Sequence, residues 1–524
     1  MRNYQTRHYQ HNKKSKIKNN QQRETRPLVQ PEYKEAPIFA AMKSYARDGA
    51  LAFHTPGHKQ GLGAHPFLKE LITEEGLRQE VSLMEELDDL HEPHGCIQQA
   101  EALAAKLWGA MDTLFIINGT TCAIQAMIMG TLQPGDKLLV PRNAHRSIIG
   151  GIILAGAEPV FIKPEIDDKL GIAMGLSASI VKAALKRHPD VKALLAVYPN
   201  YYGFCCDLTA IADLLHSQGK LLLVDEAHGA HLKFSDRLPK QALDCGADVV
   251  AQSTHKLLGS MTQTSMLHIG SKRVDRNRIR QAAGLLQSTS PNQLLLASLD
   301  IARLQMQYEG KERVERAISL SHYLRNRINA TAGQWSPDRR YCRQCRLESV
   351  YDLDETKVTV NLEAANISGI EAEEILRHDL KIQCELSDPR NLLFIISMAD
   401  TEAEIRRLSR ALEDFESEYV FSTKGSMPIS EFKVQGMGKM PVLQQAMSPR
   451  EAFFATRQKV KLEEAIGRVS GETVAFYPPG VPIICPGEVI TKEAIKYIRN
   501  YQQEGLRLSG PADGQLQYIE VIGE

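Results

Sequence analysis

The sequence predicts an α/β protein whose large domain is built on a mostly parallel, doubly wound sheet. Between residues 100 and 270, short apolar runs of strand length alternate with segments of helical spacing, which is the pattern of βαβ units. Several of these runs are followed directly by polar side chains, and ligands bind at the carboxyl ends of parallel strands. With 524 residues, the chain has room for two or three domains and a sizeable core.

The strands of this sheet are predicted from apolar runs at residues 113–117, 137–140, 193–197, 221–224 and 249–251. A lead-in at residues 35–60 precedes them, with Ile38, Ala41 and Tyr45 at helical spacing. After them, Ser288-Thr289-Ser290-Pro291 comes just before a helical run at residues 294–306. Ser and Thr hydroxyls before a helix are usually N-caps.

The character of the sequence changes after about residue 320. Residues 358–362 alternate like a half-exposed strand, residues 372–380 have helical spacing, and residues 392–397 form another strand-like run. We therefore expect four parts: a disordered basic tail (1–34), a lead-in with the large domain (35–320), an α+β small domain (321–420) and a C-terminal domain (421–524).

The N-terminal tail is strongly basic. Residues 1–30 hold eight Lys and Arg against one acid, Glu24, and few apolar residues, so the segment cannot bury enough surface to order itself. The alternative is an arm that binds an anionic partner. The chain as a whole has a net charge of zero, which gives no bulk attraction for nucleic acid or membrane.

The composition indicates a cytoplasmic protein. No apolar run approaches the roughly 18–20 residues that span a bilayer, and the polar N-terminus does not resemble a signal peptide. The nine cysteines are an odd number, which favours free thiols in a reducing compartment. Cys342 and Cys345 form a CxxC pair without a second pair or nearby histidines, so we expect no metal site.

The ends of the predicted strands carry matching chemistry. Asn118-Gly119-Thr120-Thr121 follows the first strand; a glycine permits a tight turn, and free N–H groups at a helix start bind phosphate. His145, Asp225 and Lys256 follow later strands, and Ser253 and His255 lie just before Lys256. A desolvated lysine in such a place acts as an amine nucleophile.

Together these residues fit pyridoxal phosphate. That cofactor needs a phosphate site, a lysine for its aldehyde, a carboxylate for its ring nitrogen and a flat group against its ring. The set that could supply them is Thr120, Thr121, Ser253 and His255 for phosphate, then Lys256, Asp225 and His145. Each residue alone has an ordinary explanation as a turn, helix cap or solvated loop, but their shared placement after successive strands favours a cofactor site.

Four motifs resemble the ornithine/lysine/arginine decarboxylases, which are fold type I pyridoxal-phosphate enzymes. They are residues 54–59 (HTPGHK), 87–91 (LDDLH), 225–229 (DEAHG) and 253–256 (STHK). The resemblance is to the shorter bacterial arginine or lysine decarboxylases and covers roughly residues 35–500. It implies a transferase-like large domain, an α+β small domain and a decarboxylase-type C-terminal domain.

The resemblance also implies roles for single residues. Lys256 resembles the Schiff-base lysine, Asp225 the pyridinium partner, His145 the ring-stacking histidine and His228 a histidine near the ring. Thr120, Thr121, Ser253 and His255 resemble the phosphate-site residues, and Gly119 would form the turn beside them. The loop with Thr289 and Ser290 would reach the phosphate of a neighbouring subunit, and His54 would lie near the active site, where it either packs or contacts substrate. Apart from the resemblance, Glu488 and Glu385 are candidates to accept the cationic head of a substrate, because both lie in motif-like loops.

The expected function is decarboxylation of a basic amino acid in polyamine metabolism. Arginine (to agmatine) is the first choice, then lysine (to cadaverine), then ornithine (to putrescine). An aminotransferase or a carbon–carbon lyase would use the same lysine, acid and phosphate site. A pseudoenzyme with a nucleic-acid-binding tail would have lost Lys256 or Asp225, and both are present. Larger members carry an extra N-terminal domain where this chain has only about 35 residues, so we expect a homodimer or a dimer of dimers, with no membrane or nucleic-acid partner.

Overall fold

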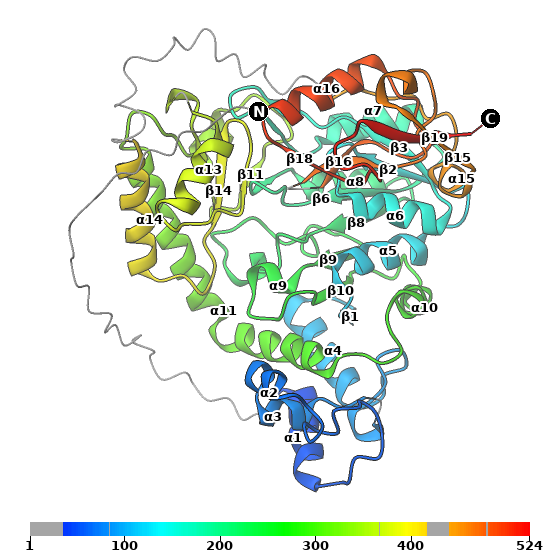
Figure 1. Cartoon of the computed structure of the whole chain (residues 1–524), viewed down its shortest axis with the longest axis vertical. Coiled ribbons are helices and arrows are strands. Elements are labelled where there is room, and N and C mark those ends of the chain that lie inside the picture. Colours follow the sequence, from blue (N-terminus) through cyan, green and yellow to red (C-terminus); the bar gives the residue numbers. More distant parts are fainter. Residues whose placement is uncertain (1–34, 83, 366, 417–439, 478–479, 524) are drawn as a thin grey trace. The chain divides into compact units, whose positions relative to one another are not determined.

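The computed structural model describes residues 35–523 except 83, 366, 417–439 and 478–479. The basic tail therefore lies outside the described residues. Figure 1 shows the large domain with its central sheet, and the small domain joined to it by one long helix, α11 (Gln293–Ile328).

A seven-stranded sheet forms the centre of the large domain. Strand β10 pairs antiparallel with both of its neighbours, while β9, β8, β6, β2 and β3 run parallel. The order across the sheet is β1 (Asp112–Ile116), β10 (Ser265–Ile269), β9 (Val249–Gln252), β8 (Leu221–Asp225), β6 (Val191–Val197), β2 (Lys137–Pro141) and β3 (Glu158–Ile162). The α/β fold predicted from the sequence is thus confirmed.

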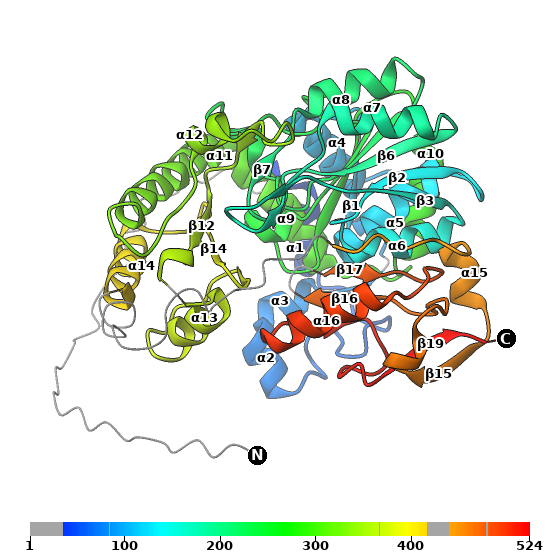
Figure 2. The same cartoon turned by 90° about the horizontal axis from the view of Figure 1, so that it is seen from above.

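Both faces of this sheet are buried because its strands are apolar on both sides. Along β6, Leu194 packs into one apolar cluster and Leu195 into the other. Figure 2 shows α5 and α6 on one side of the strands and α7 and α8 on the other. The first layer is α5 (Gly119–Thr131), α6 (Arg146–Ala155) and α10 (Arg276–Leu286); the second is α1 (Pro37–Asp48), α4 (Cys96–Trp108), α7 (Ala178–Arg187), α8 (Leu208–His216) and the start of α11.

Short elements connect these layers. They are α2 (Pro66–Ile72), α3 (Glu74–Gln79), η2 (Glu85–Leu87), η3 (Leu232–Phe234), α9 (Thr254–Leu257), α12 (Arg339–Gln344) and the strand pairs β4 (Ile166–Asp167) with β5 (Ile172–Ala173) and β7 (Phe204–Cys205) with β11 (Asp352–Leu353). Helix α11 is capped by the side chain of Asn292, which accepts from the Leu295 backbone N–H at 3.0 Å. The prediction of a Ser or Thr cap was therefore wrong.

The small domain is a three-stranded antiparallel sheet packed on helices and on the second half of α11. Its elements are β12 (Lys357–Asn361), β13 (Leu386–Ser387), β14 (Asn391–Ile395), η4 (Glu363–Ala365), α13 (Gly369–His378) and α14 (Glu402–Phe415). Strand β12 is buried along its whole length, so the half-exposed strand expected from its alternating polar residues is wrong. Its apolar side chains Val358 and Val360 pack with α11, and Lys357 packs against Gly203 of the large domain.

The last described segment has its own apolar cluster around Ile484, Ile498 and Val521. Its elements are α15 (Pro449–Phe454), β15 (Arg457–Lys461), η6 (Leu462–Ala465), β16 (Val474–Tyr477), β17 (Val481–Ile484), α16 (Lys492–Gln503), β18 (Arg507–Ser509) and β19 (Tyr518–Ile522). Arg450 ties it to α6 by donating to the Ile153 carbonyl at 2.8 Å. None of the helices in the described part of the chain combines the length and apolar character that crossing a membrane requires.

Candidate active site

The carboxyl ends of β8 and β9 bring Asp225 and Lys256 to one edge of the sheet. The two strands pair in parallel, with Asp225 opposite Ala251, and β9 leads through Ser253 into α9, which carries Lys256. A small cavity lies at this edge, lined by His145, Val197, Pro199, Tyr201, Asp225, Ala227 and His228. The catalytic residues expected from the sequence are therefore neighbours in space.

The amine of Lys256 is the centre of the site. The residue is exposed, and its Nζ lies 3.0 Å from Nε2 of His228. Desolvation lowers the pKa of this lysine, while the charges of Asp225 and Glu385 act in the opposite direction. A lowered pKa means that a larger fraction of Lys256 is the free amine than for an ordinary lysine, and the free amine is the form that attacks an aldehyde.

Asp225 is a buried carboxylate on the cavity wall. It is 5% exposed and accepts one backbone hydrogen bond, from Ala227 at 3.1 Å. Burial raises its pKa, while the charge of Lys256 and this hydrogen bond act to lower it. A cation placed in the cavity would relieve the cost of this buried charge, so the carboxylate suits a protonated ring nitrogen.

His145 caps helix α6 and borders the same cavity. Its Nδ1 accepts from the Ser147 backbone N–H at 3.2 Å, which leaves the proton of the neutral ring on Nε2. Burial, with the charges of Lys256 and Arg146, lowers its pKa to about 4. The ring packs against Gly480, where an added Cβ would come within 3.1 Å of it. His145 is therefore a neutral, flat group held by both the helix and the C-terminal segment.

The expected phosphate residues meet where α5 and α9 begin. The hydroxyls of Thr120 and Ser253 hydrogen-bond to each other, and no side chain caps the start of α5, where backbone N–H groups have no partner within the helix. Gly119 has a φ of +75°, the left-handed conformation that favours glycine. Thr121 is exposed beside them. Nδ1 of His255 lies 2.6 Å from the Thr264 carbonyl, so this ring is fixed.

These groups fit pyridoxal phosphate. Within the described residues, Oγ1 of buried Thr254 has no hydrogen-bond partner, and the hydroxyls of Thr120 and Ser253 lie at a positive helix end that favours a dianion. The carboxylate of Asp225 and the imidazoles of His145 and His228 line the cavity next to them, and the Lys256 amine contacts His228. These protein groups are the ones expected to bind an aromatic aldehyde that carries a phosphate and a protonated ring nitrogen.

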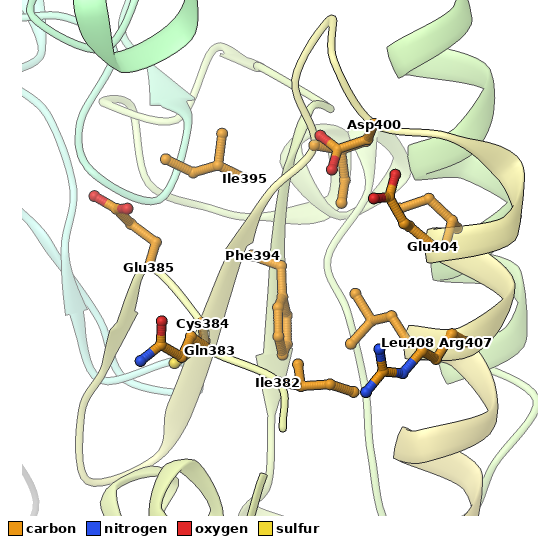
Figure 3. Close-up of a pocket in the computed structure, with 12 residues that line it drawn as sticks. Ile382, Gln383, Cys384, Glu385, Phe394, Ile395, Asp400, Glu404, Arg407 and Leu408 are labelled. Carbon is orange, nitrogen blue, oxygen red and sulfur yellow. The ribbon is translucent and has the colours of Figure 1, made fainter. Parts of the chain in front are cut away.

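The two candidate acceptors of a substrate cation have different surroundings. Glu488 is 1% exposed and pairs with Arg142 at 2.7 Å; both line a separate cavity of about 600 Å³ that also includes Tyr201. Glu385 is exposed, and its charge acts on Lys256. Figure 3 shows it in a third cavity of the small domain, on the side away from Arg407 and Glu404.

The remaining candidates are His54, Thr289 and Ser290. Among the described residues, no hydrogen bond or ion pair joins them to Lys256. Nε2 of His54 lies 2.9 Å from the Tyr45 hydroxyl, near α1. Thr289 and Ser290 are exposed in the loop between α10 and α11. A single chain does not test a contact to a neighbouring subunit, so these two assignments stay predictions.

Two residues of the site had no role in the sequence prediction. The ring of Tyr201 lies edge-on to His228, with centroids 4.9 Å apart. Its position in the loop after β6 was a usable signal. Lys357, at the start of β12, lies 3.4 Å from Nδ1 of His228. No spacing in the sequence marks it, because it reaches the site from another domain.

Comparison with known proteins agrees with this geometry. Residues 36–404 match the family described as Orn/Lys/Arg decarboxylase, major domain, and residues 434–512 match its C-terminal domain. The chain is 41% identical to an arginine decarboxylase of Bacillus anthracis and 40% identical to one of Bacillus subtilis; both alignments cover 94% of this chain and 98% of the relative. A lysine decarboxylase of Pseudomonas aeruginosa is 27% identical over 89% of this chain and 75% of its own length.

Solved structures share the fold. Lysine decarboxylase A from Pseudomonas aeruginosa aligns with a TM-score of 0.78 at 23% identity, covering 93% of this chain and 80% of that one. The lysine decarboxylase of Francisella novicida aligns with a TM-score of 0.77 at 22% identity, covering 93% and 81%. With both domains matched and a curated relative at 41% identity along nearly its whole length, the chain belongs to the Orn/Lys/Arg decarboxylase family.

Proposed function

We propose that this decarboxylase uses pyridoxal phosphate to remove the α-carboxylate of a basic amino acid, with arginine as the first choice, then lysine and ornithine. The observation that carries the proposal is the Lys256 amine beside His228, with buried Asp225 on the same cavity. The ranking of substrates is supported by the 41% and 40% identity to arginine decarboxylases, against 27% to a lysine decarboxylase.

The cofactor would be held by residues from three strand ends. Gly119, Thr120, Thr121, Ser253 and His255 would bind its phosphate, and Asp225 would keep its ring nitrogen protonated by charge pairing. Lys256 would attach to its aldehyde. When bound, pyridoxal phosphate supplies a carbonyl for an amine and a sink for the electrons that remain at Cα when carbon dioxide leaves.

The chain's own groups would control protons and water. His145 is neutral, so it would cover the ring face and exclude water without placing a cation against the pyridinium. Either His145 or Lys256 could return a proton to Cα, since His145 lines the cavity and Lys256 contacts His228 on its wall. His228 holds Nζ of Lys256 at 3.0 Å and would orient it.

For the cationic head of the substrate, we propose Glu385 rather than Glu488. Arg142 already neutralises Glu488, and a carboxylate whose charge is paired has little left to offer a second cation. Glu385 is exposed and acts on Lys256, Lys357 and Tyr201 through its charge. It is the acid that a long cationic side chain bound at Lys256 could reach.

We further propose that the chain acts as a homodimer. Between residues 49 and 72, five large apolar side chains are 76–92% exposed, namely Leu51, Phe53, Leu62, Phe67 and Leu71. An apolar segment of this kind is unusual on a monomer and typical of an interface. A second copy would cover it, and Thr289 and Ser290 would then meet a neighbouring phosphate site. The four-part division at 34, 320 and 420 is part of the same proposal, supported by separate apolar clusters in the large, small and C-terminal parts.

Product analysis tests this function. The purified chain with pyridoxal phosphate is incubated with arginine, lysine and ornithine, and the amines and carbon dioxide are measured. We expect agmatine from arginine to form fastest, with carbon dioxide in equal amount. A keto acid or an aldehyde product would instead indicate an aminotransferase or a carbon–carbon lyase, and no product from any basic amino acid would overturn the substrate class.

A further inference from the structure

A second lysine lies on the far side of His228 from Lys256. Lys357 is 1% exposed, and its Nζ lies 3.4 Å from Nδ1 of the His228 ring. The other ring nitrogen, Nε2, lies 3.0 Å from Nζ of Lys256. One imidazole therefore separates two amines, one from the large domain and one from the small domain.

The fold holds Lys357 in this position. Its backbone pairs with Ile395 in the small-domain sheet, and its N–H donates to the Asp354 carbonyl at 3.1 Å. On the other side is Gly203, where an added Cβ would come within 2.9 Å of Cβ of Lys357. A lysine usually extends its ammonium into water. This one is instead enclosed with its amine aimed at a ring nitrogen.

The charges around the three groups disfavour two ammonium groups at once, although Asp225 and Glu385 favour a charge on Lys256. Burial lowers the pKa of Lys357 to about 8, with Asp354 and Glu385 raising it and Lys256 lowering it. The pKa of His228 is well below its usual value because of burial and the charges of Lys357, Lys256, His231 and His145. The imidazole is therefore neutral, and two ammonium groups on either side of it would repel each other.

We propose that Lys357 and Lys256 share one proton through His228, so that Lys357 is a positioning residue that determines when the Lys256 amine is free. In one state, the Lys357 ammonium donates to Nδ1, and the Nε2–H of the ring donates to the lone pair of Lys256. In the other, a proton has passed from Lys357 to Nδ1 while the Nε2 proton has passed to Lys256. The second state holds a neutral Lys357, a neutral ring of the opposite tautomer and a Lys256 ammonium, so the total charge is unchanged.

This relay deepens the proposed function and rests on it. The reaction requires a free Lys256 amine at neutral pH, and it requires that amine to take up a proton when it is released. A relay meets both needs because the buried Lys357 stores the proton. Asp354 stabilises the stored charge, and it is itself held by His231 at 3.1 Å.

Competitive labelling of Lys256 tests the relay without using turnover. The full-length protein, with no cofactor added, is treated briefly with formaldehyde and borohydride from pH 6 to 10, and methylation of the Lys256 peptide is measured by mass spectrometry. In Lys357→Met, the second amine that could hold the proton is gone, so the proton stays on Lys256. Labelling of Lys256 at neutral pH should then fall about ten-fold, which corresponds to a rise of one unit in its pKa. In Lys357→Arg, a fixed cation remains that cannot release its proton, so labelling should be at least as fast as in the wild type.

A purely structural role for Lys357 predicts the opposite order. Methionine fits the space of lysine and would leave the labelling profile unchanged, whereas the bulkier arginine would disturb it, and either result in folded protein overturns the proposal. In a His228→Gln background, Lys357→Met should have no further effect; an effect that persists there would exclude the imidazole as the path. If the labelling shifts occur but no basic amino acid is decarboxylated, the relay stands and the proposed function fails.

Discussion

Replacing Asp225 by asparagine separates the electrostatic role of this residue from its packing. Asp225→Asn keeps the size of the side chain and removes its charge. Because the carboxylate is 5% exposed and accepts one backbone hydrogen bond, from Ala227, little water screens its effect on the ring site. Loss of one such preorganised group costs about a hundred- to a thousand-fold in kcat, or about 3 to 4 kcal/mol of barrier. Steady-state release of carbon dioxide measures this loss.

Stability should move in the opposite direction. Since burial raises the folded-state pKa of Asp225, its ionised form destabilises the cofactor-free protein above the ordinary aspartate pKa, and this cost is absent below it. At pH 7, Asp225→Asn should therefore be at least as stable to urea as the wild type. Glu226→Gln is a matched control: the pKa of that buried acid is raised to about 8, so it is already uncharged at pH 7 and its amide should leave kcat near the wild-type value. Near wild-type turnover in Asp225→Asn would refute the reasoning.

Three further predictions follow from buried charges and exposed surface. Glu488→Gln should lower the free energy of unfolding by about 3 to 5 kcal/mol, because it leaves the Arg142 cation buried without its partner. The KM for the substrate should stay near the wild-type value. A steep rise in KM at unchanged stability would instead show that Glu488 binds the substrate cation. Glu226 is protonated in the folded protein and ionised in the unfolded chain between pH 6.5 and 8, so the free energy of unfolding should fall as pH rises, by up to about 1.4 kcal/mol per pH unit. Urea titrations of Glu226→Gln should show a shallower dependence on pH. An identical dependence in the variant would contradict the role of Glu226. Phe53→Asp should sediment as a monomer where the wild type sediments as a dimer; an unchanged sedimentation coefficient would place the interface elsewhere.

Much of the large domain was predictable because parallel strands buried on both faces are continuous apolar runs. The five predicted strands differ from the observed ones by one or two residues at their ends. Helix α11 extends to Ile328, well beyond residue 306, because its second half packs on the small domain, a contact that sequence spacing does not display. The strand at residues 358–362 looked half-exposed because Thr359 and Asn361 are polar, yet they are only 1% and 6% exposed.

The site was predictable where its residues follow strands and less so where another domain supplies them. Asp225, Lys256 and Thr120 each come directly after or next to an apolar run, and the topology of parallel strands forces such positions to one edge of the sheet. Lys357 reaches His228 only because the small domain packs back against residues 203 and 228. Glu488 stands in a conspicuous motif, but its partner Arg142 lies 346 residues away, and this pairing is invisible without the fold.

Reductive trapping decides whether Lys256 is the residue that holds the cofactor. The purified protein with pyridoxal phosphate is treated with borohydride, digested and mapped by mass spectrometry, with Lys256→Ala as the control. We predict one reduced cofactor per chain, attached to Lys256, with loss of the visible absorption band, and neither signal in the control. Attachment to another lysine, including Lys357, or no attachment at all would contradict the assignment of Lys256 and the function built on it.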